Sequence, residues 1–256
     1  MKHVNLTGKA TVLLFLLTSI AGLAQLPSFN LGGSGSPVGA DIATMSRLFG
    51  SNTGFTAKSE IRMYDKSQKE TISATMNFAY LENKTRIEID ATQMKNKDLP
   101  AGIADQLKQM GMDQIVTLIR PDRKAMYVIY PKLEACLTVP LPKENDGQAK
   151  VDKQAIGKET LDGHACVKNK VTVTSGKGEK EELTVWNATD LKDFPVQVLT
   201  KQNEDTVITR YKQIQLTKPD AKLFDLPAGF KEYSDTQAFM QGIMAKILAG
   251  GLPETK

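Results

Sequence analysis

Apolar and polar residues alternate along much of the chain, and this alternation constrains the fold more than any other feature. The clearest run is Ile72, Ala74, Met76, Phe78 and Tyr80. Because successive side chains of a strand point to opposite faces, the pattern predicts a β-sheet with one buried and one solvated face. Strands are predicted at 61–63, 72–80, 86–90, 114–119, 125–130, 135–139, 164–174, 182–186, 196–200 and 206–214. Even spacing and short turns favour one curved antiparallel sheet or an open barrel. Residues 143–158 are polar and charged, and we interpret them as a solvated connection.

Two stretches have helical periodicity instead. Pro100 opens the first, which continues through Ile103, Leu107 and Met110. The second begins at Ser234, with Gln237 completing a predicted capping box. Its apolar stripe consists of Phe239, Met240, Ile243, Met244, Ile247 and Leu248. This helix is too short to span a bilayer. It can pack on the sheet as core or cover an apolar cavity as a lid, and the pattern fits both.

The first 24 residues are typical of a secretory signal peptide. Lys2 and Lys9 accompany an apolar run from 10 to 21, and small residues precede a predicted cleavage site after Ala24. No cysteine follows that site to accept a lipid. We therefore expect a soluble protein, periplasmic or secreted, with no transmembrane anchor after cleavage. Residues 25–54 are expected to form a flexible lead-in with a short helix capped by Asp41, 55–233 the β domain, and 234–256 the amphipathic helix and tail.

The two cysteines, Cys136 and Cys166, both follow the predicted leader. An even number of cysteines in an oxidising compartment favours a disulfide. Each cysteine lies on the strand phase opposite to the apolar residues, where a buried thiol is not expected. We predict that they pair, with two free thiols as the alternative.

Charge and composition argue against several functions. Removal of the leader leaves 31 basic and 29 acidic residues, so nothing attracts the chain to nucleic acid. His164 is the only histidine after the leader, and no nucleophile elbow, zinc ligand set or phosphate-binding glycine loop occurs. An exported hydrolase is therefore disfavoured, and we expect no enzyme, cofactor or metal. The chain has ten methionines and one tryptophan, which suits either core filling or an adaptable apolar surface.

Several short motifs occur in an order that resembles a known superfamily. They are Ile119-Arg-Pro-Asp122, Tyr127–Pro131, Leu161–Cys166, Leu183-Thr-Val-Trp186, Phe194-Pro-Val196, Thr209-Arg-Tyr211 and Leu223–Phe230. This order resembles bacterial lipoprotein carrier-like (LolA/LolB-like) domains, and more narrowly a related group of domains of unknown function, over about 55–233. The resemblance implies an unclosed antiparallel barrel with short helices on its concave side, and a cavity that takes up the acyl chains of lipoproteins.

Our leading hypothesis is an exported carrier or binding protein for an apolar ligand, a lipid or acyl chain. Burying each methylene contributes about 0.8 kcal/mol, so such a site needs no polar motif. The candidate ligand contacts, each of which fits plain core as well, are Met63, Met76, Phe78, Ile87, Met126, Val128, Phe239, Ile243 and Ile247. The alternative is a non-enzymatic envelope protein-interaction or stress-sensing module, in which the C-terminal helix or a sheet edge docks a partner.

Overall fold

The computed structural model describes residues 48–248, except for 98, 142–149, 175–177, 179 and 203. The predicted signal peptide, the Asp41-capped helix and the C-terminal tail lie outside these residues. The strands are β1 (Gly54–Tyr64), β2 (Glu70–Leu81), β3 (Lys84–Asp90), β4 (Lys95–Asn96), β5 (Gln114–Arg120), β6 (Ala125–Tyr130), β7 (Ala135–Pro140), β8 (Lys150–Leu161), β9 (His164–Thr174), β10 (Lys180–Ala188), β11 (Phe194–Gln202), β12 (Asp205–Gln215) and β13 (Lys231–Tyr233). The α-helices are α3 (Ile103–Gln109) and α4 (Thr236–Leu248). Short 3-10 turns are η1 (Ala91–Gln93), η2 (Pro121–Arg123), η3 (Pro131–Leu133), η4 (Thr189–Leu191) and η5 (Ala221–Phe224).

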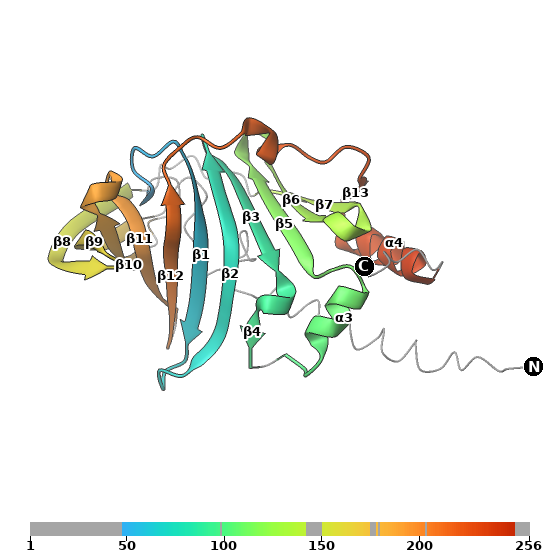
Figure 1. Cartoon of the computed structure of the whole chain (residues 1–256), viewed down its shortest axis with the longest axis horizontal. Coiled ribbons are helices and arrows are strands. Elements are labelled where there is room, and N and C mark those ends of the chain that lie inside the picture. Colours follow the sequence, from blue (N-terminus) through green and yellow to red (C-terminus); the bar gives the residue numbers. More distant parts are fainter. Residues whose placement is uncertain are drawn as a thin grey trace, which may run out of the picture.

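The strands form one large sheet that does not close into a barrel. Its order is β13-β7-β6-β5-β3-β2-β1-β12-β11-β10-β9-β8, with β4 beside β2 off this path. All pairings are antiparallel except that of β13 with β7. In Figure 1 the sheet extends from β8 at one side to β7 and α4 at the other. The predicted fold class, a curved open antiparallel sheet with helices, is confirmed.

The interpretation of residues 143–158 as a connection is wrong for the part from 150 onward. Lys150–Leu161 forms β8, a twelve-residue strand at the edge of the sheet. Nearly all of its side chains are exposed. Apolar and polar residues alternate in a strand when one face is buried and the other is solvated. Both faces of β8 are solvated, so its sequence lacks the periodicity that identified the other strands.

We call one surface of the sheet the inner face. It carries Phe55, Ile61, Met63, Ile72, Met76, Phe78, Ile87, Ile115, Thr117, Met126, Val128, Val185, Val196, Val207 and Tyr211, which the strand register places on one side. The ring centroids of Phe55 on β1 and Phe194 on β11 are 4.7 Å apart, although β12 lies between these strands. Two strand spacings in a flat sheet are about 9.5 Å. The side chains thus converge because the sheet curves toward the inner face.

The opposite, outer face is partly covered by the segment that follows β12. Phe224 is fully buried against Ala79 and Leu81, while Leu226 and Phe230 pack on an apolar patch of β5, β6 and β7. Arg120 at the end of β5 holds this segment against the sheet by donating a hydrogen bond to the Phe224 carbonyl oxygen at 2.5 Å. It also donates to both carboxylate oxygens of Asp122, at 2.9 and 2.7 Å. These contacts bury the apolar patch of β5, β6 and β7 on the outer face.

The predicted Cys136–Cys166 disulfide does not form. Both thiols are free and buried, 1% and 3% exposed. Cys136 is on β7 and Cys166 on β9, and β6, β5, β3, β2, β1, β12, β11 and β10 lie between them in the sheet. Strand phase correctly placed Cys136 opposite Leu137, but the outer face is covered there by Leu226 and Phe230. Position off the main apolar face did not imply exposure to solvent.

The two α-helices of the described residues, α3 and α4, cover one end of the inner face. They pack with η1 and η3 on β5, β6 and β7. The start of α4 differs from the predicted Ser234–Gln237 capping box, because Asp235 caps the helix by accepting from the Ala238 N–H at 2.7 Å. Within the described part of the chain, neither helix combines the length and apolar character that a bilayer span requires.

Candidate functional site

The six candidate ligand contacts that sequence placed on the sheet all lie on the inner face. Across the ladders, Phe78 pairs with Ile87, Thr117 pairs with Val128, and Met126 pairs with Ile119. Their environments differ. Met76 and Phe78 are buried, whereas Met63, Ile87, Met126 and Val128 are half-buried. The sheet therefore brings these six residues to one surface, where the degree of burial differs from one to the next.

One end of the inner face is filled by aromatic side chains, which we call the aromatic cluster: Phe49, Phe55, Phe78, Tyr80, Phe194 and Tyr211. The ring of Phe49, from just before β1, lies within 6.0 Å of each of the other five rings, centroid to centroid. Burial raises the pKa of Tyr211 strongly. Of the candidate contacts, Phe78 belongs to this cluster and Ile87 packs against it. Phe78 and Ile87 are thus packed among the protein's own side chains.

The end covered by the helices is also well packed, and we call it the helix cluster. Phe239 and Ile243 of α4 are each 2% exposed. The Phe239 ring contacts Tyr130 and Tyr233, with centroids at 5.2 and 5.5 Å. Burial raises the pKa of Tyr130 to about 12. Val128 packs against the same cluster. Ile247 belongs to α4, but its side chain lies outside what the structure describes.

A third region of the inner face is less covered. Ile61 and Met63 near the end of β1 and Ile72 near the start of β2 are all half-buried. Met63 pairs directly with Ile72. We call these three residues the open part of the inner face. Met63 is the one candidate contact that falls here.

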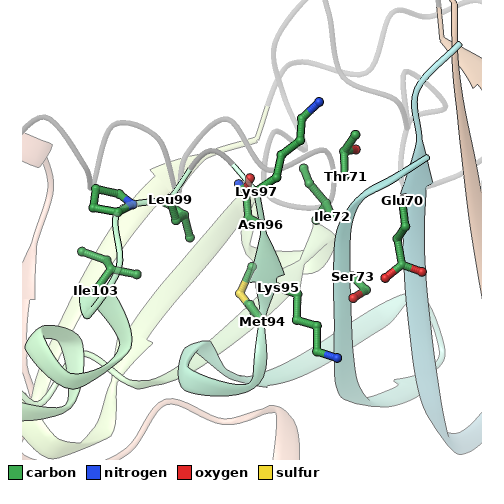
Figure 2. A pocket seen from close by; sticks show the side chains of 11 residues that line it. Glu70, Thr71, Ile72, Ser73, Met94, Lys95, Asn96, Lys97, Leu99 and Ile103 are labelled. Atoms are coloured by element: carbon green, nitrogen blue, oxygen red, sulfur yellow. The ribbon is translucent and has the colours of Figure 1, made fainter. Parts of the chain in front are cut away.

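A pocket of about 450 Å³ adjoins the open part of the inner face, and Ile72 belongs to both. It lies between the start of β2, the short strand β4 and the approach to α3. Figure 2 shows Leu99 and Ile103 on the helix side, Glu70 and Ser73 on the β2 side, and 94–97 between them. The lining is apolar at Ile72, Met94, Leu99, Pro100 and Ile103, and polar at Glu70, Thr71, Ser73, Lys95, Asn96 and Lys97.

None of the nine candidate contacts lines this pocket. The helical spacing from Pro100 did identify Ile103 as apolar, but nothing in the sequence indicated β4. That strand is two residues long, held to β2 by the pairings Ile72–Asn96 and Ser73–Lys95. A two-residue strand is too short to show a period. The pocket exists because this strand departs from the main path of the sheet.

Most charged groups around the pocket have partners. The Lys97 Nζ lies 3.8 Å from an Asp65 carboxylate oxygen. Arg62, on β1 beside the pocket, lies 3.8 Å from Glu70. Backbone hydrogen bonds from Lys69 and Ser67, with the nearby Lys97, hold the pKa of Asp65 below its usual range. Among the described residues, Lys95 forms no ion pair.

His164, the one histidine that follows the predicted leader, pairs with an acidic side chain. Its Nδ1 lies 2.7 Å from Asp190 Oδ2, in a pair that is partly exposed. The nearby Cys166 thiol donates to the His164 carbonyl oxygen at 3.3 Å. Burial raises the pKa of this thiol, which disfavours the nucleophilic thiolate. Elsewhere in the described ranges, no three His, Cys, Asp or Glu side chains gather as a metal site.

Comparisons with known proteins return similar folds only. No protein-family model matches the chain, and no curated protein matches it either. Among solved structures, it is similar to a LolA superfamily protein from Nitrosomonas europaea, with 10% identity, a TM-score of 0.37, and coverage of 70% of this chain and 93% of that one. It is also similar to lipoprotein LppX from Mycobacterium tuberculosis, with 12% identity, a TM-score of 0.36, and coverage of 68% and 94%. A third is LprF from Mycobacterium bovis, with 14% identity, a TM-score of 0.36, and coverage of 73% and 99%.

Proposed function

We propose that this chain is an exported carrier or binding protein for an apolar ligand, a lipid or acyl chain, which binds at the open part of the inner face. One observation carries the proposal. The aromatic and helix clusters fill two regions of the inner face with the protein's own side chains, whereas Ile61, Met63 and Ile72 are half-buried beside a pocket of about 450 Å³. Small-molecule pockets typically measure about 300–1,000 Å³.

The chemistry of the open part fits such a ligand. Its three side chains are aliphatic or thioether groups, and Met adapts its shape to irregular apolar partners. Each ligand methylene removed from water there contributes about 0.8 kcal/mol. In this proposal Phe239 and Ile243 act as a fixed wall, because both are packed into the helix cluster.

A matched pair of isoleucine substitutions tests the proposal. Ile72→Gln places an amide on the open part of the inner face and should weaken uptake of a fluorescent fatty acid about tenfold, or about 1.4 kcal/mol. Ile156→Gln, on β8, replaces a side chain that is 52% exposed and should leave uptake unchanged. Native mass spectrometry of protein purified from its host should show a co-purified lipid. Absence of both a lipid and fatty-acid uptake would overturn the proposal.

A specific observation also supports the second candidate, a partner-docking module. The twelve-residue strand β8 is paired on one side by β9 and ends the strand order of the described sheet. Such an edge can accept a strand from another protein. The pairing of β8 with β9 shifts register between Ala155 and Gly157. Ile156, which lies at this shift, has an exposed side chain. For this candidate Ile156→Gln should abolish co-purification of an envelope protein while Ile72→Gln should preserve it.

A further inference from the structure

One residue inside a strand has a backbone conformation that favours glycine. Among the described residues, the other non-glycine residues with a positive φ lie in the connections between strands, whereas Gln213 lies within β12 and has a φ of 50°. The pairing of β12 with β1 shifts register between Thr56 and Lys58, so that Gln213 and Ile214 both lie opposite Ala57. This is a β-bulge, and its left-handed residue carries a Cβ that makes the conformation unfavourable.

The bulge separates its two side chains. Ile214 packs against the aromatic cluster on the inner face, whereas Gln213 is exposed and lines a hollow of about 290 Å³. We call this the outer hollow. It lies over β12, β1, β2 and β3, which run side by side at the centre of Figure 1. Bulges are frequent beside functional sites, where they redirect a side chain.

Two rows of directly opposed residues form the floor of the outer hollow. The first row is Thr56, Ala79 and Arg86, and the second is Lys58, Asn77 and Glu88. These positions alternate with Phe55 and Phe78 of the inner face, so all six side chains belong to the outer face. Ala79 is the smallest of them, which leaves the floor low between longer neighbours. Leu223, 41% exposed, adds an apolar wall.

The polar groups of the outer hollow differ in how far they are engaged by the protein. Arg86 donates to a Glu88 carboxylate oxygen at 2.6 Å and to the Leu223 carbonyl oxygen at 2.9 Å. By contrast, the side chains of Asn77 and Gln213 form no hydrogen bond within the described part of the chain, and Lys58 forms no ion pair there. An amide both donates and accepts hydrogen bonds, as a hydroxyl does.

We propose that the outer hollow binds a sugar unit that carries a carboxylate, such as a uronate. The sugar hydroxyls form hydrogen bonds with the amides of Asn77 and Gln213, and the carboxylate accepts from the Lys58 ammonium, a charge-assisted bond. A volume of about 290 Å³ lies at the small end of ligand pockets and suits one sugar ring. This inference goes beyond the proposed function, because the outer hollow lies on the opposite face of the sheet from the open part of the inner face.

The first test compares three ligands. Glucuronate, glucose and acetate are each titrated into the full chain and followed by the side-chain amide NMR signals of Asn77 and Gln213. Glucuronate should shift both signals and bind about fivefold more tightly than glucose at low ionic strength. This difference should shrink in about 1 M salt, where the screening length is about 3 Å. Acetate should bind at least about tenfold more weakly than glucuronate.

The second test uses the strained backbone. Gln213→Gly relieves the strain and removes the amide, so it should raise the melting temperature by about 2–4 °C and weaken glucuronate binding about fivefold. Gln68→Gly is the matched control, because Gln68 also has a positive φ, 60°, but lies in the turn before β2 and outside the outer hollow. It should raise the melting temperature similarly and leave binding unchanged.

A third test removes the charge. Lys58→Gln should weaken glucuronate binding about fivefold and leave glucose binding unchanged. Its control is Lys153→Gln, at an exposed position on β8, which should alter neither.

Three results would each overturn the sugar site. They are the absence of amide shifts with glucuronate, acetate binding as tightly as glucuronate, and full glucuronate affinity in Gln213→Gly. None of these results would affect fatty-acid uptake at the open part of the inner face, so the proposed function stands or falls separately.

Discussion

The aromatic cluster and the open part of the inner face lie on the same surface and on β1 and β2, yet their side chains are buried to different degrees. At the start of β1, Phe55 is completely buried, and its ring lies 4.7 Å from that of Phe49. Eight residues further along β1, Met63 is half-buried beside Ile72. An extra ring from outside the sheet seals the first region. The second region adjoins a pocket.

This contrast shows that an apolar sheet face does not by itself indicate a binding site. The same alternation produced both regions, and Phe78 and Met63 are equivalent in their sequence pattern. They differ in what covers them. A residue on the inner face contributes mainly to stability where the protein's own side chains cover it, and is available to a ligand where they do not.

The largest expected effect comes from breaking the sealed region. Phe55→Ala should lower the free energy of unfolding by about 3–5 kcal/mol, because it leaves a cavity among five other rings. Met63→Ala should cost only about 1 kcal/mol, since its side chain is already half-exposed, while weakening fatty-acid uptake. Chemical denaturation and uptake measurements on both variants check this. Equal destabilisation by the two would contradict the distinction.

An intermediate effect is expected in the helix cluster, where Gly242 of α4 faces Tyr233. A Cβ at Gly242 would overlap the Tyr233 ring. Gly242→Ala should therefore destabilise by about 1–3 kcal/mol and loosen α4, as measured by the melting temperature and by amide exchange in the helix. Gly157→Ala is the control, because its Cβ would meet no atom within 4 Å. A neutral Gly242→Ala would argue that α4 is not held against Tyr233.

The smallest effects are expected in the chemical labelling of the two buried thiols, whose labelling rates depend on how often the surrounding structure opens. In a Cys136→Ala background, native-state labelling of Cys166 should be slow, because this thiol packs in the core around the aromatic cluster. Phe55→Ala should accelerate the labelling, and Met63→Ala should not. Acceleration by both variants would indicate that the open part and the aromatic cluster unfold together.

The pH dependence of Cys136 should follow its burial on the outer face. Burial raises its pKa from 9.0 to about 11, so the folded state holds the proton more tightly than the unfolded state does. The corresponding stability is present below pH 9 and is lost as the pH rises toward about 11. Unfolding measurements across this interval should show a steeper loss for the wild type than for Cys136→Ala.

Sequence periodicity predicted most of the fold because burial on one face leaves a period of two. It identified the strand 72–80 and the helix around Leu107, both of which the structure contains. It missed β8, where water on both faces removes the period, and β13, which is only three residues long. It also misjudged Cys136, because strand phase states which face a residue occupies and not what covers that face.

The sequence by itself determined that the chain builds a sheet with one continuous apolar face, since alternation of side chains is a local property of each strand. Only the tertiary structure decided where that face stays open. Phe49 fills one region, α4 fills another, and β4 departs from the sheet to leave a pocket beside Ile72. These contacts join residues distant along the chain, and no local pattern encodes which of them meet.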